Sequence, residues 1–473
     1  MSKDFTFTFP IDPVKQIIHM DRREFIKISG AGALAMGASA CAPGGVKGGS
    51  DATGNGSASG GGEMEYRVNP HNGDKVSLLG YGCMRWPMIK GRDGERDKID
   101  QETVNELVDY AYKHGVNYYD TSPAYLQGQS EIAAGIALSR YPRDSYYIAT
   151  KLSNFGDASP EGSKQMYYDS FRYLQTDYYD YYLLHAIGNG GLPAFNRRYV
   201  DNGMMDFLMK EREAGRIRNL GFSFHGTQPA FDEFLKMQDK YHWDFVQIEM
   251  NYLDWRHARV PRNVNAEYLY EELDKRELPI VIMEPLLGGR LARLSDSVVE
   301  RLKAREPDLS VASWAFRFVG SYPRVLCTLS GMTSMDPLMD NVKTFSGFKP
   351  LNQDEIDFIL KTADIIAEYP TVNCNDCKYC MPCPWGIDIP GIFLHYNEMV
   401  NSGDIATSKA QEDYKKLKRR YLVSYDRAVE TLRQANHCVG CKTCEPHCPQ
   451  SIEIPKELQR IDRYIEALRR DTL

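Results

Sequence analysis

The sequence has no excess of positive charge. Its 57 Lys and Arg are outnumbered by 64 Asp and Glu, which gives a formal net charge of −7 at pH 7. Proteins that bind nucleic acid need a basic surface to neutralise phosphates, so we expect no nucleic-acid partner. The chain of 473 residues, 42% of them hydrophobic, is long enough for one large globular domain and a smaller one.

The N-terminal region lacks an apolar run long enough to span a membrane. The twin arginine of Asp21-Arg22-Arg23 precedes a Gly- and Ala-rich run over residues 28–40, which is too short for a membrane helix. Ala38-Ser39-Ala40 offers the small residues that a signal peptidase cleaves. Residues 1–41 therefore resemble a Tat export signal, and we expect export to the periplasm or the outer side of a membrane. The alternative is a disordered tail on a cytoplasmic protein.

Cys41 directly follows the expected cleavage site. Ala38-Ser39-Ala40-Cys41 resembles a lipobox, with Ala where Leu is usual, and predicts a lipid anchor on Cys41. Residues 42–65 are rich in Gly, Ser and Ala and predict a flexible linker. Because only Asp21 separates Met20 from the twin arginine, the true start of the chain is either Met1 or Met20.

From about Val76 onward, short β-branched or aromatic runs alternate with amphipathic stretches such as 101–114 and 164–174. This alternation is typical of a parallel sheet covered by helices. Eight such runs predict a TIM (β/α)8 barrel, an α/β fold, over residues 66–345. The expected strands are 76–80, 117–120, 146–151, 179–185, 219–224, 245–250, 279–284 and 325–329.

Polar side chains stand where three of these strands end. Asp120 ends the second strand and Tyr125 follows it, Lys151 ends the third and His185 ends the fourth. In a TIM barrel these ends meet at one mouth, where the chemistry takes place. A tyrosine beside a lysine cation has a lowered pKa and can protonate a carbonyl, and an aspartate can supply the lysine's counter-charge. The four residues predict carbonyl reduction; singly, His185 could be structural and Asp120 a helix cap.

Three motifs give this barrel a specific resemblance. Gly80-Tyr81-Gly82, Asp120-Thr121-Ser122-Pro123-Ala124-Tyr125 with Glu131, and Glu284-Pro285-Leu286 resemble the aldo/keto reductase family. The resemblance implies a catalytic tetrad of Asp120, Tyr125, Lys151 and His185, a small carbonyl or alcohol substrate, and a nicotinamide cofactor. Leu126 departs from the family, which usually has Gly after the tyrosine.

The same resemblance implies a nucleotide site. Ser223 and Gln247 would hold the nicotinamide carboxamide, while Ser330, Gly331 and Asn341 would lie at the phosphate-binding end. Phe224 replaces an Asn of many relatives, and Met283 replaces an aromatic residue that stacks on the nicotinamide. No Arg occurs over residues 336–341, so the cofactor is either NADP or NAD.

Eight of the eleven cysteines crowd into two short runs, which favours cofactor ligation over disulfides. Their spacings match or nearly match those of bacterial ferredoxins, in which the last cysteine of each run binds the other cluster. Two [4Fe–4S] clusters follow from this rule; zinc in two sites of four cysteines each is the alternative. One cluster would take Cys374, Cys377, Cys380 and Cys448, and the other would take Cys383, Cys438, Cys441 and Cys444.

The segment between the two cysteine runs has a mostly helical pattern. A repeat relates Cys383–Pro390 to Cys448–Pro455, which indicates that the two halves share an origin. Residues 346–473 therefore resemble a mainly helical dicluster ferredoxin-like domain.

Together these patterns predict an oxidoreductase. The barrel would transfer a hydride between NAD(P) and a carbonyl or alcohol, and the clusters would exchange electrons with an electron-transfer protein. We find no flavin motif to link the two processes. The alternative is a nucleotide-binding redox sensor or electron-transfer subunit in which turnover is incidental.

Overall fold

The computed structural model describes residues 62–92, 95–258 and 262–473. The predicted export signal 1–41, the lipid-anchor residue Cys41 and residues 42–61 of the predicted linker lie outside the described residues. The described residues, from 62 onward, form one compact unit. Within the described part, none of the helices has the length and apolarity needed to cross a bilayer.

Eight parallel strands close into a barrel in the order β10-β11-β12-β3-β6-β7-β8-β9, which confirms the predicted TIM barrel. The strands are buried on both faces, as expected when helices cover a parallel sheet. They are β3 (Leu79–Gly82), β6 (Tyr118–Asp120), β7 (Tyr147–Leu152), β8 (Tyr179–Ile187), β9 (Ile217–Phe224), β10 (Phe245–Glu249), β11 (Ile280–Met283) and β12 (Val325–Ser330).

The predicted first strand, 76–80, is wrong in its position. Val76 belongs to β2 (Lys75–Ser77), which pairs antiparallel with β1 (Tyr66–Val68), and the barrel strand β3 starts at Leu79. The apolar run of Val76, Leu78 and Leu79 continues across the break between two separate strands, so hydrophobicity alone does not reveal the break. A second small hairpin joins β4 (Met88–Ile89) and β5 (Lys98–Ile99).

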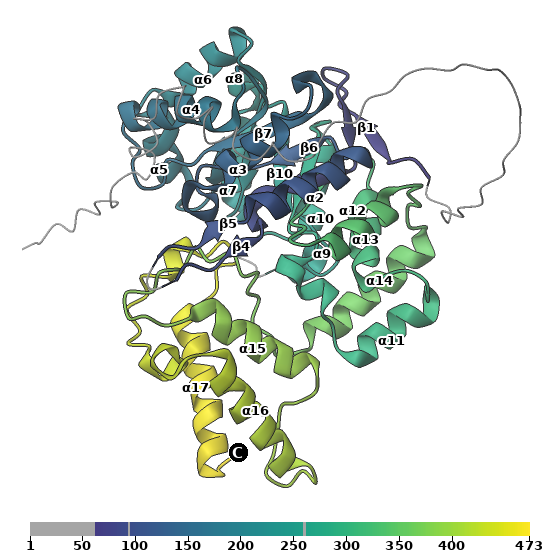
Figure 1. Ribbon diagram of the computed structural model, residues 1–473, viewed down its shortest axis with the longest axis vertical. Coiled ribbons are helices and arrows are strands. Elements are labelled where there is room, and N and C mark those ends of the chain that lie inside the picture. The colour runs from purple at the N-terminus through teal and green to yellow at the C-terminus, as the bar shows by residue number, and fades with distance from the viewer. Residues whose placement is uncertain (1–61, 93–94, 259–261) are drawn as a thin grey trace, which may run out of the picture. The chain divides into compact units, whose positions relative to one another are not determined.

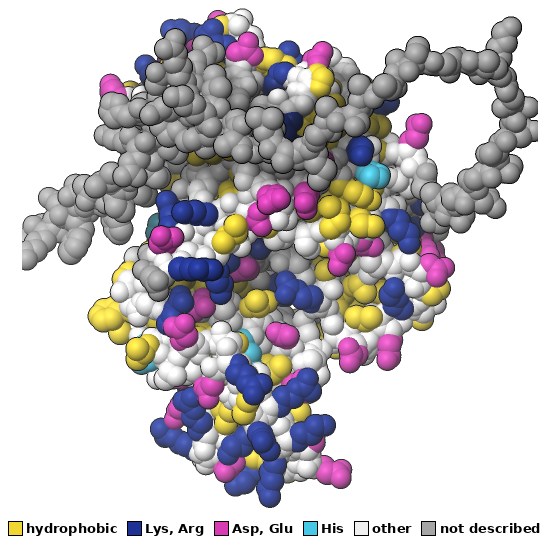
Figure 2. All heavy atoms as spheres, in the orientation of Figure 1, with side chains coloured by type: hydrophobic (Ala, Val, Ile, Leu, Met, Phe, Trp, Pro, Cys, Tyr) yellow, Lys and Arg dark blue, Asp and Glu magenta, His cyan; other side chains and the backbone are white. Residues whose placement is uncertain are grey.

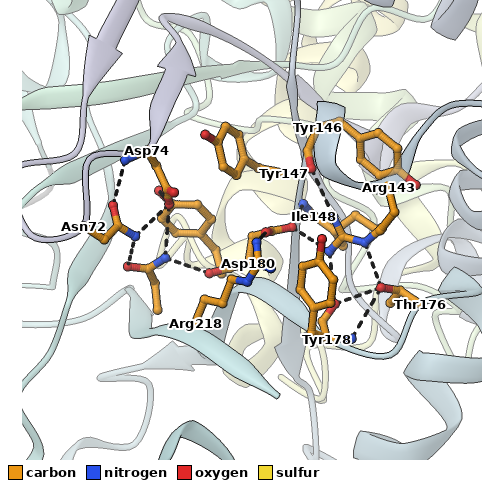
Figure 3. Close-up of polar contacts among 12 residues, drawn as sticks. Asn72, Asp74, Arg143, Tyr146, Tyr147, Ile148, Thr176, Tyr178, Asp180 and Arg218 are labelled. Carbon is orange, nitrogen blue, oxygen red and sulfur yellow. Dashed lines mark hydrogen bonds and ion pairs between the residues drawn. The ribbon is translucent and has the colours of Figure 1, made fainter. Parts of the chain in front are cut away.

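A polar network ties together the amino-terminal ends of the central strands (Figure 3). Asp180 on β8 accepts hydrogen bonds from Arg143 at 2.6 Å, from Arg218 at 3.1 Å and from the Ile148 amide at 2.9 Å. Asp74, which directly precedes β2, accepts a hydrogen bond from the Tyr181 hydroxyl at 2.9 Å. These contacts lie at the barrel end opposite the predicted active site, so they bear on stability rather than on chemistry.

Helices surround the barrel, and several begin at a side-chain cap. Asp100, Ser159 and Ser310 accept hydrogen bonds from backbone amides at the starts of α2, α4 and α12. The helices are α2 (Gln101–Lys113), α3 (Ser130–Leu138), α4 (Pro160–Leu174), α5 (Gly191–Phe195), α6 (Met204–Glu213), α7 (Gln228–Lys236), α8 (Gln238–Tyr241), α9 (Asp254–His257), α10 (Ala266–Asp274), α11 (Asp296–Arg305), α12 (Val311–Gly320), α13 (Met335–Phe345) and α14 (Gln353–Ala367). Short 3-10 or π turns are η2 (Cys83–Arg85), η3 (Tyr125–Gly128), η4 (Arg143–Ser145), η5 (Asn196–Val200) and η6 (Leu287–Ala292).

Two segments that the predicted boundaries place outside the barrel pack on it. Met64, within the predicted linker, is buried and bridges to Ser346. Helix α14, beyond the predicted boundary at residue 345, buries Ile359, Ala363 and Ile366 in the barrel's own core. Sequence patterns do not show which neighbour an amphipathic helix covers.

The C-terminal region is helical, as predicted. Helices α15 (Ile389–Asn401), α16 (Tyr414–Ala428) and α17 (Ile454–Arg470) pack on one another around a separate core that includes Phe393 and Ile461 (Figure 1). Short turns η7 (Thr431–Arg433), η8 (Ala435–His437) and η9 (Glu445–His447) carry or flank the second cysteine run. Lys and Arg side chains gather at the end of this region that lies farthest from the barrel (Figure 2).

Candidate functional site

A cleft of about 670 Å³ opens at the carboxyl ends of the barrel strands. Because parallel strands end at one mouth, residues far apart in the sequence meet there. Its lining includes six of the nine residues predicted for the barrel site: Asp120, Tyr125, Gln247, Ser330, Gly331 and Asn341. The other three, Lys151, His185 and Ser223, are buried.

Lys151 and Asp120 form a buried ion pair. The Lys151 Nζ donates to Asp120 Oδ1 at 2.5 Å and to the Thr121 carbonyl at 2.8 Å. Gln247 donates to the other carboxylate oxygen at 3.2 Å. Burial raises the pKa of Asp120 and lowers that of Lys151, and each charge partly offsets this effect on its partner. The pair therefore depends on both members, since either charge alone would be buried without compensation.

Tyr125 lies between this pair and His185. The Lys151 Nζ is 4.9 Å from the centre of the Tyr125 ring, and the His185 ring stands edge-on to it at 5.7 Å. Burial raises the pKa of Tyr125, and the charge of Asp120 raises it further. The predicted lowering of this pKa by Lys151 is therefore wrong, because burial of the hydroxyl has the larger effect.

His185 is held by two serines. Its Nδ1 lies 2.6 Å from the Ser153 hydroxyl and 3.2 Å from that of Ser122. Burial, followed by the charges of Lys151 and Arg198, lowers the pKa of His185 well below its usual value. The imidazole is therefore neutral near pH 7, and the described residues give its Nε2 no hydrogen-bond partner.

Sequence reasoning missed the residues that orient His185. Arg198, on η5, donates to the His185 carbonyl at 2.9 Å and to the side chain of Asn154 at 3.1 Å. Ser153 comes directly after β7. Ser122 lies inside the quoted family motif, which was the only sequence signal for any of them.

The nucleotide-side residues are placed in two groups. Ser223 and Gln247 are paired in register on β9 and β10, and the Ser223 hydroxyl accepts the Ala186 amide at 2.8 Å. Asn341 donates to the Ser330 hydroxyl at 2.9 Å where β12 ends. Met283 also lines the cleft.

Two cations and a helix terminus also line the cleft, and the sequence did not point to them. They are Arg85, Arg293 and the start of α12 at Ser310 to Ala312. Backbone amides at a helix start and arginine side chains are both suited to phosphate. The absence of Arg over residues 336–341 therefore does not leave this cleft without positive charge.

The eight clustered cysteines fall into two groups by their neighbours. Burial raises the pKa values of Cys374, Cys377 and Cys380, and the nearby Cys448 thiol raises each one further. The same holds for Cys438 and Cys444 beside Cys383. The structure thus brings together the two sets of four thiols that the spacing predicts.

The order of the cysteines bears on the metal that they fit. Each run has four closely spaced cysteines, and a proline follows the last one. Zinc sites usually take two separate Cys-x2-Cys pairs, whereas this arrangement is that of [4Fe–4S] ligands in bacterial ferredoxins. The thiols therefore suit [4Fe–4S] clusters better than zinc.

Comparison with known proteins matches both halves. The model of the aldo/keto reductase family matches residues 78–363, and that of the 4Fe-4S dicluster domain matches residues 373–453. An L-galactose dehydrogenase of Arabidopsis thaliana is 24% identical over 316 residues, covering 62% of this chain and 92% of the relative. A D-arabinose 1-dehydrogenase of Saccharomyces cerevisiae is 34% identical over 135 residues, covering 27% of this chain and 38% of the relative.

Solved structures show the same fold. The holo form of an aldo-keto reductase from Bacillus halodurans superposes with a TM-score of 0.50 at 23% identity, over 63% of this chain and 96% of that chain. Since the family match covers more than half of the sequence, the chain is an oxidoreductase that belongs to the aldo/keto reductase family and carries a 4Fe-4S dicluster domain.

Proposed function

We propose that the barrel interconverts a carbonyl and an alcohol with NAD(P), using Asp120, Tyr125, Lys151 and His185. The observation that carries this proposal is the meeting of Tyr125 with the Lys151–Asp120 pair and His185 at the cleft. A bound nicotinamide supplies the hydride for reduction and accepts it in oxidation. In reduction, the carbonyl carbon gains the hydride, its oxygen gains a proton, and NAD(P)H becomes NAD(P)+.

The protein's part is to position the substrate and transfer the proton. Tyr125 donates its hydroxyl proton to the carbonyl oxygen, and Lys151 stabilises the resulting phenolate. Neutral His185 directs its Nε2 to the same oxygen. Burial excludes water from these groups and strengthens their interactions.

The nucleotide would lie along the cleft from the tetrad to α12. Ser223 and Gln247 would hold the carboxamide, and Ser330, Gly331 and Asn341 would hold the nucleotide further along. Arg85, Arg293 and the amides at the start of α12 favour the phosphates. Two relatives are named as sugar dehydrogenases, so polyhydroxylated aldehydes and sugars are the first substrates to try.

The dicluster domain would hold two [4Fe–4S] clusters that exchange electrons with a protein partner. When bound, the clusters supply one-electron chemistry. Residues 1–41 would direct export by the Tat route, with Cys41 as a lipid anchor. Cell fractionation and N-terminal analysis of the mature protein test this, and a full-length cytoplasmic chain would contradict it.

The central experiment uses protein purified without oxygen. Iron and sulfide analysis should give about eight irons per chain, and both nicotinamide nucleotides are tested for binding and for turnover of a panel of aldoses. Tyr125→Phe should lose turnover by about 10²- to 10⁴-fold while retaining the clusters and nucleotide binding. Tyr168→Phe, on the exposed face of α4, is the matched control.

Unchanged turnover in Tyr125→Phe would remove the proposed proton donor. Zinc in place of iron would remove the electron-transfer role of the cysteine domain.

A further inference from the structure

The loop that carries the first cysteines lies against the mouth of the barrel. Arg85, which lines the nucleotide cleft, donates to the Asn375 carbonyl and pairs with Asp376 at 3.5 Å. A Cβ on Gly288, another residue of the cleft, would overlap the same Asn375 carbonyl oxygen. The loop backbone therefore contacts the wall of the cleft directly.

Cys374 itself borders a cavity that adjoins this cleft. The cavity, of about 310 Å³, is lined by Cys374, Arg290 and Arg293, and it shares Gly288 and Arg293 with the nucleotide cleft. Arg290 also donates to Asn373 at 3.1 Å, which fixes the chain just before the cysteine. The first cysteine thus shares a cavity with Arg293, one of the proposed phosphate-binding groups.

The fourth cysteine of this set is fixed to the barrel as well. After Cys448, Gln450 donates to Glu249 at the end of β10. The next residue, Ser451, hydrogen-bonds Asn263 at 3.1 Å. Both segments that supply the first set therefore rest on the rim of the barrel, although they lie far apart in sequence.

Tyr379 links this set to the catalytic groups. It stands between Cys377 and Cys380 in sequence, and it lies close enough to Asp120 and Tyr125 to interact electrostatically with both. Cys377 is a neighbour of the same tyrosine. The Tyr379 side chain therefore lies near both the cysteine set and the tetrad.

The second set has a different environment. Cys441 is exposed, the Thr443 hydroxyl donates to its sulfur at 3.4 Å, and the Trp385 side chain lies near it. Trp385, Leu432 and Val439 are 56%, 79% and 57% exposed, although all three are apolar. Arg433 donates to the Gly386 carbonyl at 3.2 Å, which brings Leu432 near Trp385. Exposed apolar side chains near a site are typical of a protein-binding surface.

We propose that the two cysteine sets have different roles. The set of Cys374, Cys377, Cys380 and Cys448 forms part of the barrel site. Tyr379 positions the bound nucleotide next to this set. The set of Cys383, Cys438, Cys441 and Cys444 is the outward end, where a one-electron carrier protein docks on Trp385, Leu432 and Val439. This inference rests on the proposed iron–sulfur clusters but not on turnover in the barrel.

The arrangement suits a carrier protein because the two sets also adjoin. Cys380 of the first set and Cys444 of the second are near enough to interact. Electron carriers bind through small, weak interfaces, which a few exposed apolar residues can supply. A carrier on this surface would reach the second set without entering the cleft.

The test is electron paramagnetic resonance of the reduced holoprotein. The probes are tetrahydro analogues of NADH and NADPH, which bind but cannot give up a hydride. Cys374→Ser and Cys441→Ser assign the signals, since each removes a ligand of one set. The analogue should shift the signal that Cys374→Ser alters and leave the signal that Cys441→Ser alters unchanged.

Tyr379→Phe should reduce that shift at least twofold, whereas Tyr414→Phe, a matched change in the same domain, should not. Trp385→Ala should slow oxidation by a protein acceptor such as flavodoxin about tenfold, with no effect on oxidation by the small dye methyl viologen. The inference would be overturned if the analogue shifted the signal assigned by Cys441→Ser, or if it shifted neither signal. It would also be overturned if Trp385→Ala slowed oxidation by flavodoxin and by methyl viologen equally. The shift requires nucleotide binding but not catalysis. Absence of turnover in the wild-type protein would therefore overturn the proposed reaction, while the spectroscopic test of this inference would still hold.

Discussion

The Thr150 hydroxyl donates a 2.5 Å hydrogen bond to Glu131 Oε1, and this carboxyl is buried beside the barrel wall. Ser170 donates to its other oxygen at 3.2 Å. Burial raises the pKa of Glu131 to about 7, and the two hydroxyls oppose that rise. Glu131 is thus a buried group that changes its charge near neutral pH.

The raised pKa of Glu131 predicts a pH-dependent stability. The folded protein binds this proton up to about pH 7, whereas the unfolded chain releases it near 4.5. The contribution of this group to stability is therefore fully present below pH 4.5 and falls, by up to about 3 kcal/mol, as pH rises to 7. Urea unfolding at a series of pH values across this window should show the slope in wild type and a flatter profile in Glu131→Gln. Parallel slopes would assign the dependence to other groups.

The Lys151–Asp120 pair predicts non-additive effects on stability. Lys151→Met leaves the Asp120 carboxylate buried without its cation and should cost about 3 to 5 kcal/mol of unfolding free energy. Adding Asp120→Asn removes that uncompensated charge and should restore much of the loss without restoring turnover. A double-mutant cycle by denaturant unfolding measures the coupling. Simple additivity would mean that the two charges do not support each other.

How much of this site follows from sequence differs between its parts. Buried parallel strands have a distinct composition and can be recognised in the sequence. Because their carboxyl ends meet at one mouth, Asp120, Tyr125, Lys151 and His185 are predicted to lie together. Cysteine spacing is equally local, and the sets of thiols that it defines are those that lie together. Such features depend on short-range pattern plus one rule of topology.

The parts that could not be predicted depend on long-range packing. Arg198 orients His185 from a π turn, and Tyr379 approaches Tyr125 although the two lie in different domains. Neither Arg198 nor Tyr379 lies in a sequence pattern that identifies the residue near which it folds. The pKa of Tyr125 was missed for a related reason, since burial in the folded site outweighs a charge that the sequence does reveal.

The Asp180 network predicts a loss of stability without a loss of chemistry. Asp180→Asn removes the ion pairs with Arg143 and Arg218, which are partly exposed, and should cost about 1 to 2 kcal/mol of unfolding free energy. Because these residues lie at the amino-terminal ends of the strands, kcat and KM should stay within about twofold of wild type. Asp169→Asn, in an exposed pair on α4, should cost less than about 0.5 kcal/mol. If kcat of folded Asp180→Asn were reduced at temperatures below its unfolding transition, the network would affect the active site at the other end of the barrel.

Gly288 predicts a change confined to the loop over the cleft. Its φ of +66° disfavours any residue with a Cβ, and that Cβ would also overlap the Asn375 carbonyl oxygen. Gly403 has nearly the same φ, +69°, but a Cβ there would meet nothing within 4 Å. Gly288→Ala and Gly403→Ala therefore share the backbone strain, of about 1 kcal/mol, and differ only in the clash.

If the loop forms one wall of the cleft, Gly288→Ala and Gly403→Ala should differ in hydrogen exchange and in nucleotide binding. Gly288→Ala should raise the rate of hydrogen exchange over residues 373–380 and weaken nucleotide binding by several-fold, because Arg85 and Asn375 can no longer keep their contact. Gly403→Ala should leave both at wild-type values while lowering stability slightly. Equal behaviour of the two variants would mean that the loop yields to the added methyl group without disturbing the cleft, and the wall would then have to be sought elsewhere on the rim.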